Sequence, residues 1–289
     1  MTLPRIGVFD SGVGGLTVLK AMAEQTPAHY FYFGDTARLP YGTKSAETVA
    51  RYAIGAARFL EAQNIDLLVI ACNTATALAL PQIKEAAHVP VVGVVEPGAA
   101  MAAEISKQRA AIVIATEATV SSHAYRNALR LHGVEAYEKA CPLFVPLVEE
   151  GWIEHPVTEQ VAGIYLRDAI AQASTPADVL VLACTHYPLI APLLRRVVPP
   201  EMQIVDSAES TARVVRRVLD DSRCHPQRSE IPQGGTERSR RTTISEETQA
   251  REHRTFRFYV TDSVDKFKRL AARFLGRQVD HVEHVDLGG

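Results

Sequence analysis

Two cysteines, Cys72 and Cys184, each follow a short apolar run and precede a pair of polar residues, Asn73–Thr74 and Thr185–His186. A free thiol has an ordinary pKa of about 8.5, and a nearby cation or a helix N-terminus lowers it towards neutrality. A thiolate and a thiol can therefore coexist near pH 7 as a base and an acid. Two such groups on opposite faces of one carbon could remove a proton from one face and return a proton to the other, so the pair indicates inversion at a carbon centre.

The segments around the two cysteines repeat one another. Residues 66–78, DLLVIACNTATAL, align without gaps on residues 178–190, DVLVLACTHYPLI. The downstream segments VVGVVEPGA and QIVDSAESTA match more weakly at a similar offset. The pattern predicts two α/β halves of related topology. If the halves face each other, the two cysteines lie on opposite walls of one cleft.

Two glycine-containing turns could bind a ligand near the thiols. The turn DSGVGGL at 10–16 follows the apolar run IGVF and opens a predicted helix, where its glycines let backbone amides approach an anion. It has neither the Walker pattern nor the Gly-x-Gly-x-x-Gly spacing of dinucleotide folds. A carboxylate ligand therefore fits better than a phosphate. The turn GDTARLPYGTKS at 34–45 places Tyr41 and Gly42 near the same edge.

Each thiol has a candidate helper: His186 lies two residues after Cys184, and Asp10 is a candidate neighbour of Cys72. Simpler interpretations stay open, because free cysteines are often small buried side chains and the polar residues after a strand often cap a helix. Two equivalent thiols favour chemistry, since caps alone do not require a thiol twice. A zinc site on Cys72, Cys184 and His186 is another alternative, but no Cys-x-x-Cys or second histidine cluster supports it. We expect no metal.

The elements that must position these residues alternate between short apolar strands and longer helical segments, which predicts parallel α/β sheets. Several strands are apolar without alternation, as expected where helices cover both faces of a sheet. Ligands should then bind beyond the carboxyl ends of the strands. The predicted strands are residues 6–9, 30–34, 66–71, 89–95, 110–115, 178–183 and 202–206.

Length and composition exclude several classes of protein. With 289 residues, of which 47% are hydrophobic, the chain can bury a large core, and its formal net charge of −2 gives no global field to recruit nucleic acid or an anionic membrane. No transmembrane-length apolar run or signal-peptide pattern is present, so a cytoplasmic location is the default expectation. Four scattered cysteines do not form a disulfide framework and are expected to be thiols.

The composition changes near the C-terminus. Residues 221–254 are charged and almost without large apolar side chains, which predicts a disordered surface insertion. Its arginines are interspersed with glutamates and lack aromatic neighbours, so a solvated loop is favoured over a nucleic-acid contact. The strand-like run FRFYVTDSV and the amphipathic segment VDKFKRLAARFLG, closed by Gly276, then predict a strand and a helix.

Six motifs in this order and spacing resemble the glutamate racemases of bacterial cell-wall synthesis: DSGVGGLTV, GDTARLPYG, ACNTATA, GVVEPGA, CPLFVPLVEEG and LACTHYPLI. The resemblance covers nearly the whole chain. It implies a cofactor-independent isomerase that interconverts L- and D-glutamate and supplies D-glutamate for peptidoglycan. It further implies that Cys72 acts on the D-enantiomer and Cys184 on the L-enantiomer, assisted by Asp10 and His186. The substrate-binding residues that it implies are Asp10, Ser11, Tyr41, Gly42, Asn73, Thr74, Thr185 and His186.

The same resemblance implies two similar three-layer α/β domains with largely parallel sheets, related by pseudo-two-fold symmetry, with the active site in the cleft between them. The first domain comprises residues 1–97 plus 210–289, and the second comprises residues 98–209. Glu149 matches a further acidic residue near the site, and Thr116 and Thr119 match ligands although Ala115 and Ala118 stand where the family has glycines. A homodimer is a family expectation.

Three other functions stay open. A related racemase could act on aspartate or another small acid, and a substrate panel separates the two. A carboxylate-binding sensor without turnover would bind its ligand after loss of either thiol. A thiol-disulfide oxidoreductase is disfavoured by the missing Cys-x-x-Cys.

Overall fold

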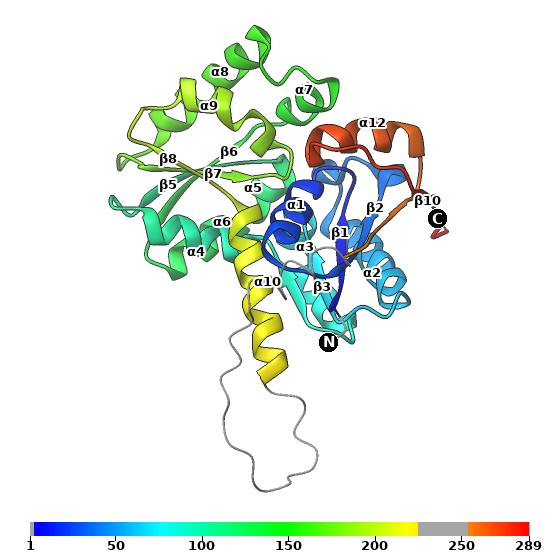
Figure 1. The fold of residues 1–289 in the computed structure, drawn as a ribbon. Helices are drawn as coiled ribbons and strands as arrows, with labels where there is room; N and C mark the ends of the chain where they lie inside the picture. Colours follow the sequence, from blue (N-terminus) through cyan, green and yellow to red (C-terminus); the bar gives the residue numbers. More distant parts are fainter. Residues whose placement is uncertain (1–2, 225–253, 289) are drawn as a thin grey trace, which may run out of the picture.

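A computed structural model describes residues 3–224 and 254–288, and within them every strand belongs to one of two parallel sheets (Figure 1). The first sheet has six described strands in the order β10-β9-β2-β1-β3-β4. These strands are β1 (Arg5–Asp10), β2 (His29–Gly34), β3 (Leu67–Ile70), β4 (Val91–Gly93), β9 (Phe256–Val260) and β10 (Val282–His284).

The second sheet has four described strands in the order β6-β5-β7-β8. They are β5 (Ala110–Ala115), β6 (Glu135–Ala140), β7 (Val179–Ala183) and β8 (Gln203–Asp206). This order equals that of β2-β1-β3-β4 in the first sheet, and β3 and β7 are the two strands that precede the cysteines. The predicted α/β class with two related parallel sheets is confirmed.

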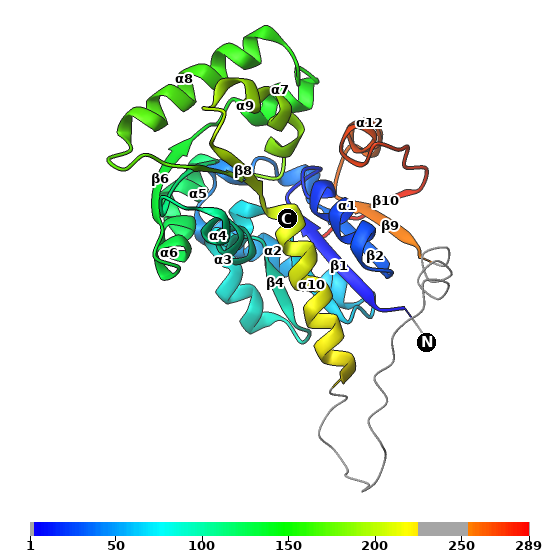
Figure 2. The ribbon, with the colours of Figure 1, turned by 60° about the vertical axis from the view of Figure 1, so that its left-hand side comes forward.

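Helices cover both faces of each sheet, and α10 runs between the two lobes (Figures 1 and 2). In the lobe of the first sheet, the helices are α1 (Leu16–Gln25), α2 (Ala46–Glu61), α3 (Asn73–Ala86) and α12 (Val264–Leu275), with short 3-10 turns at Thr36–Arg38 and Tyr41–Thr43. The remaining elements are α4 (Val95–Ile105), α5 (Glu117–Ser122), α6 (Ala124–Leu131), α7 (Phe144–Glu150), α8 (Pro156–Gln172), the turn Tyr187–Ile190, α9 (Ala191–Val197) and α10 (Ser207–Cys224).

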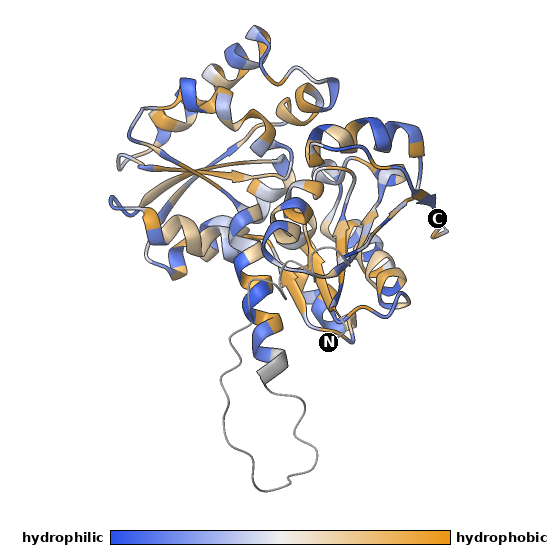
Figure 3. Cartoon of the chain, in the orientation of Figure 1, coloured by the Kyte–Doolittle hydropathy of each residue, from blue (hydrophilic) through white to orange (hydrophobic). Residues whose placement is uncertain are grey.

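Strand β7 shows why the strands read as continuous apolar runs. All five of its residues are buried. Leu180 and Leu182 join one core cluster, while Val179 and Val181 join another on the opposite face. Since alternate side chains of a strand point to opposite faces, helices on both sides leave no polar position. The central strands accordingly stand out as hydrophobic against helices of mixed hydropathy (Figure 3).

The repeated aspartate that precedes β3 and β7 has the same task in both sheets. Asp66 accepts a hydrogen bond from the backbone N–H of Arg5 at 2.8 Å, just where β1 begins. Asp178 accepts hydrogen bonds from the N–H groups of Lys107 and Gln108 at 2.6 and 2.9 Å, ahead of β5. Each aspartate thus ties its own strand to the start of the neighbouring strand, which gives the sequence repeat a structural reason.

The seven strands predicted between residues 6 and 206 are present, as are strand β9 and helix α12, which ends at Gly276 with φ of 70°. Strands β6 and β10 were not predicted. The predicted insertion at 221–254 lies outside the described residues except at its margins, and α10 continues to Cys224. The predicted domain boundaries at 97 and 209 fall within α4 and α10 and stay a prediction. No helix in the described part of the chain is long and apolar enough to cross a membrane.

Candidate active site

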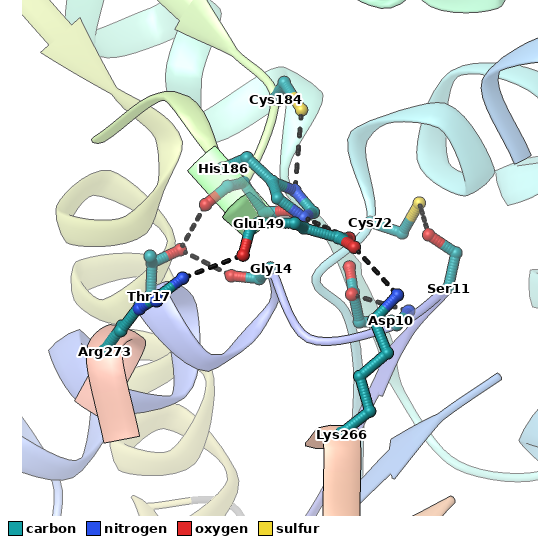
Figure 4. Close-up of polar contacts among 12 residues, drawn as sticks. Asp10, Ser11, Gly14, Thr17, Cys72, Glu149, Cys184, His186, Lys266 and Arg273 are labelled. Carbon is teal, nitrogen blue, oxygen red and sulfur yellow. Dashed lines mark hydrogen bonds and ion pairs between the residues drawn. The ribbon is translucent and has the colours of Figure 1, made fainter. Parts of the chain in front are cut away.

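The predicted site residues gather where the central strands of both sheets end (Figure 4). Asp10 is the last residue of β1, and Cys72 follows β3 after one alanine. Thr116 comes directly after β5 and Cys184 directly after β7. The carboxyl ends of parallel strands are where such sheets present functional groups, so the topology brings equivalent positions of the two halves to one region.

Cys72 is the N-cap residue of α3 and is held by hydrogen bonds to that helix and to Ser11 of the β1–α1 turn. Its Sγ accepts from the backbone N–H of Ala75 at 3.4 Å, and its thiol lies 3.4 Å from the hydroxyl oxygen of Ser11. Burial, and next the charge of Asp10, raise the pKa of Cys72 to about 12, although the contacts to Ser11 and Ala75 oppose the rise. In this environment Cys72 therefore prefers its protonated form.

Cys184 stands beside an imidazole that is part of a chain of charged groups. Its Sγ lies 4.0 Å from Nδ1 of His186, whose Nε2 lies 3.3 Å from Oε1 of Glu149. Burial opposes protonation of His186, but the contacts to Cys184 and Glu149 outweigh it and raise the pKa of His186 to about 10. The imidazolium supplies a cation next to the Cys184 sulfur.

Asp10 connects the two thiol environments. Its Oδ2 accepts a hydrogen bond from the N–H of Gly12 at 2.9 Å, and burial raises the pKa of its carboxyl, while the positive charge of His186 lowers it. The same carboxylate acts on Cys72 through its charge. A change at Asp10 will therefore affect the electrostatic environment of both His186 and Cys72.

The halves touch at the glycine-rich turn. A Cβ placed on Gly14 would lie 2.2 Å from Oγ1 of Thr185 and 2.6 Å from Nδ1 of His186, distances that no real side chain tolerates. The hydroxyl of Thr17, three residues on, donates to the carbonyl of Thr185 at 3.2 Å. Gly14 is thus required for close approach of the turn to the Thr185–His186 segment. Sequence reasoning singled out the glycines for anion binding and missed this contact.

Three threonines from both halves share hydroxyl contacts. Thr74 Oγ1 lies 3.0 Å from that of Thr116 and 3.3 Å from that of Thr119, and the last two lie 2.9 Å apart. Gly42 also packs here, since a Cβ on it would come within 3.0 Å of the Thr116 Cβ. The structure therefore brings Thr116 and Thr119 together with Thr74.

Two predicted ligands have side chains that hydrogen-bond to other side chains of the protein. Asn73 Oδ1 accepts from the hydroxyl of Tyr125 at 2.6 Å. The hydroxyl of Tyr41 donates to Oδ2 of Asp35 at 2.5 Å. Tyr125 belongs to the other half of the molecule and had no local signal, whereas Asp35 lies in the turn segment at 34–45 that the sequence already placed near the same edge as Tyr41.

Two buried polar atoms at the site have no hydrogen-bond partner among the described residues: Oδ1 of Asp10 and Nδ2 of Asn73. One is an acceptor with negative charge and the other is a donor, and such atoms are costly to leave unpaired. A ligand with a cationic group and an anionic group would satisfy both. Among the described residues, no group of three His, Cys, Asp or Glu side chains is arranged to hold a metal ion.

Comparison with known proteins decides the family. Residues 6–215 match the Asp/Glu/Hydantoin racemase family. The chain belongs to this family. A glutamate racemase from Koribacter versatilis (strain Ellin345) is 60% identical over 287 residues, covering 99% of this chain and 98% of the relative. The predicted resemblance and the predicted enzyme class, a racemase, are confirmed.

Solved structures of glutamate racemases have the same fold as this chain. Glutamate racemase from Thermus thermophilus in complex with β-chloro-D-alanine is 41% identical, with a TM-score of 0.80 over 98% of this chain and 97% of that one. Glutamate racemase from Francisella tularensis in complex with D-glutamate is 32% identical, with a TM-score of 0.82 over 99% of both chains. The fold predicted from the sequence is therefore that of glutamate racemase structures.

Proposed function

We propose that this racemase interconverts L- and D-glutamate by proton transfer between the substrate Cα and two thiols, Cys72 and Cys184, without a cofactor. The observation that carries the proposal is their equivalence: each thiol follows the corresponding strand, β3 or β7, of two sheets with the same strand order. Each also has an ionisable neighbour, Asp10 for Cys72 and His186 for Cys184. The relatives named above as glutamate racemases support the choice of substrate.

The unpaired polar atoms suggest how an amino acid is held. The ammonium group of glutamate donates to Oδ1 of Asp10, and a carboxylate accepts from Nδ2 of Asn73, because these atoms lack partners among the described residues. The remaining ligands in this proposal are Ser11, Tyr41, Gly42, Thr74, Thr185 and His186. The hydroxyls of Thr116 and Thr119 contact Thr74 and extend this set.

In the L-to-D direction, the thiolate of Cys184 takes the α-proton and becomes a thiol, and the electron pair stays on Cα. The thiol of Cys72 then gives its proton to the opposite face of Cα and becomes a thiolate. The imidazolium of His186 stabilises the Cys184 thiolate before this step. The D-to-L direction uses the same groups with exchanged roles. The assignment of Cys72 to D-glutamate and Cys184 to L-glutamate is the one that the sequence resemblance implies.

Asp10 gives the Cys72 thiolate a physical reason to form only with substrate present. Burial and the charge of Asp10 raise the pKa of Cys72 to about 12. A substrate ammonium paired with Asp10 offsets that negative charge and so lowers the free energy of the thiolate. Closure around the substrate adds desolvation, which strengthens these electrostatic effects.

The wider role follows from the same proposal. D-glutamate made by this reaction serves as a peptidoglycan precursor in the cytoplasm, as the sequence resemblance implies. The division into residues 1–97 plus 210–289 and residues 98–209, and a homodimer, belong to this proposal as well.

The test uses purified protein in deuterated water with L-glutamate and no added cofactor, followed by optical rotation and by α-deuterium content. We expect the rotation to decay to zero with one deuterium gained per inversion. If the optical rotation decays with L-aspartate but not with L-glutamate, the protein is instead a related racemase that acts on aspartate. An unchanged α-hydrogen with both acids, together with measurable glutamate binding, would favour the carboxylate-binding protein.

A further inference from the structure

Helix α12 contacts Glu149 at two points. The Nζ of Lys266 lies 3.2 Å from Oε2 of the Glu149 side chain. The Nη1 of Arg273 donates to the backbone carbonyl of the same residue at 2.8 Å. Glu149 belongs to α7, beside the second sheet, whereas α12 connects two strands of the first sheet (Figure 1). The contacts therefore join the two halves of the molecule.

The spacing on α12 makes these contacts compatible with one rigid helix. Lys266 and Arg273 are seven residues apart, two helical turns, and so lie on the same face, with Phe274 next to them. Arg273 reaches the C-terminal end of α7, where carbonyls lack helical partners and the helix dipole favours a cation. Gly151, which ends α7 with φ of 84°, leaves the space, because a Cβ there would lie 2.6 Å from the Arg273 guanidinium.

The same face of α12 also touches the imidazole that serves Cys184. The ring of Phe274 packs edge-on against the ring of His186, with centroids 5.3 Å apart and an interplanar angle of 85°. The second oxygen of Glu149 pairs with His186 Nε2 at 3.3 Å. Lys266 and His186 thus bind opposite oxygens of one carboxylate, which fixes its orientation from both sides.

We propose that Lys266 is a positioning residue for the Cys184 half of the site: through the two oxygens of Glu149, it fixes the carboxylate that orients and charges His186. The proposal rests on the proposed two-thiol racemisation. Lys266 does not reach the Cys72 environment, which is formed by Ser11, Ala75 and Asp10. Its effect should therefore fall mainly on the Cys184 thiol and reach Cys72 only indirectly, through His186 and Asp10, unlike that of a residue that only stabilises the fold.

The groups that face His186 set the sign of the expected change. They are Cys184 on its own segment, Glu149 of α7, Asp10 at the end of β1, and the uncharged ring of Phe274 of α12, with Lys266 and Arg273 behind Glu149. Removal of the Lys266 charge alone would favour the imidazolium. Release of the Glu149 carboxylate would disfavour it, and the proposal requires that this second effect exceeds the first.

The first test isolates each thiol. Of the two proposed catalytic thiols, the Cys72→Ala variant retains Cys184. It is expected to exchange the α-hydrogen of L-glutamate with deuterated water without inversion. The Cys184→Ala variant retains Cys72 and is expected to exchange the α-hydrogen of D-glutamate. Adding Lys266→Gln should slow the first exchange by up to about fivefold, the factor that corresponds to an exposed ion pair, and slow the second exchange clearly less. Equal slowing of both exchanges, or no slowing of either, would overturn the proposal.

The second test measures the imidazole directly. The 15N signals of His186, assigned with a His186→Gln variant, give its pKa in the wild type and in Lys266→Gln, Lys266→Arg and Lys268→Gln. We expect the pKa of His186 to fall in Lys266→Gln and to recover in Lys266→Arg. Lys268→Gln is the matched control on the same helix and should leave it unchanged. A rise or no change in Lys266→Gln contradicts the proposal even if the wild type racemises glutamate, whereas a wild type without racemisation contradicts the proposed function.

Discussion

Gly14 lies so close to Thr185 that a Cβ on the glycine would sit 2.2 Å from the threonine Oγ1. The contact joins the β1–α1 turn to the segment that carries His186. We predict that Gly14→Ala lowers kcat/KM on the order of 100-fold, because it displaces groups that must be placed to within about 1 Å. Stopped assays of racemisation at several substrate concentrations measure the effect.

The matched control is Gly55→Ala on α2, where an added Cβ meets nothing within 4 Å. Alanine is also the better helix former, so this variant should unfold at the same or slightly higher denaturant concentration. Wild-type kcat/KM in Gly14→Ala would show that the turn can move away from Thr185 without cost.

The threonine cluster should contribute to substrate affinity. Thr74→Val keeps the shape of the side chain but removes the hydroxyl that contacts Thr116 and Thr119. We expect KM for glutamate to rise by roughly 10-fold or more, the loss of a hydrogen bond to a charged group. Thr76→Val, on the same helix with its hydroxyl on the carbonyl of Ile70, is the control and should keep the wild-type KM.

Asp10 should affect the reactivity of Cys72. Burial is the largest cause of the raised pKa of Cys72, and the Asp10 charge is the next. Asp10→Asn removes only the second cause, so the pKa of Cys72 should fall in part, and iodoacetamide should alkylate this thiol faster at a given pH. Mass spectrometry of the digested protein measures the extent of alkylation at Cys72 and at the buried Cys141 in the same sample. The alkylation rate of Cys141 should not change. Slower alkylation of Cys72 would mean that Asp10 does not oppose its ionisation.

His186 should make stability depend on pH in a defined direction. Its pKa is raised from 6.5 to about 10, so protonation of the folded protein stabilises it fully below pH 6.5, and this stabilisation is lost as the pH rises towards 10. The difference in free energy of unfolding between wild type and His186→Gln should therefore shrink from pH 6.5 to 10. Urea titrations at fixed pH steps measure it, and a difference that is constant over this range would exclude the paired imidazolium.

The sequence predicted the elements whose own residues carry a clear apolar pattern and missed the polar strands at the sheet edges. Strands β3 and β7 were predicted because both faces are covered and every position is apolar. Strand β6, EAYEKA, lies at the edge of its sheet and has one fully buried residue, so its pattern resembled a polar connection.

In the site, too, local motifs were predicted and contacts between distant positions were missed. The candidate residues near Cys72 and Cys184 were found from motifs within a few positions of each thiol. The contact of Lys266 with Glu149 joins positions 117 residues apart in the chain, and that of Tyr125 with Asn73 joins positions 52 apart. Only the packing of the two halves creates these pairs, so no local pattern could reveal them.

The central claim is that Cys72 and Cys184 are the two proton-transfer groups, one for each face of the substrate. The most direct measurement is racemisation of L-glutamate and D-glutamate by Cys72→Ser, Cys184→Ser and, as a control for loss of a buried thiol, Cys141→Ser. We predict that the first two variants lose racemisation in both directions, since each direction needs both groups, while Cys141→Ser retains it. Racemisation at the wild-type rate by either of the first two variants would contradict the account.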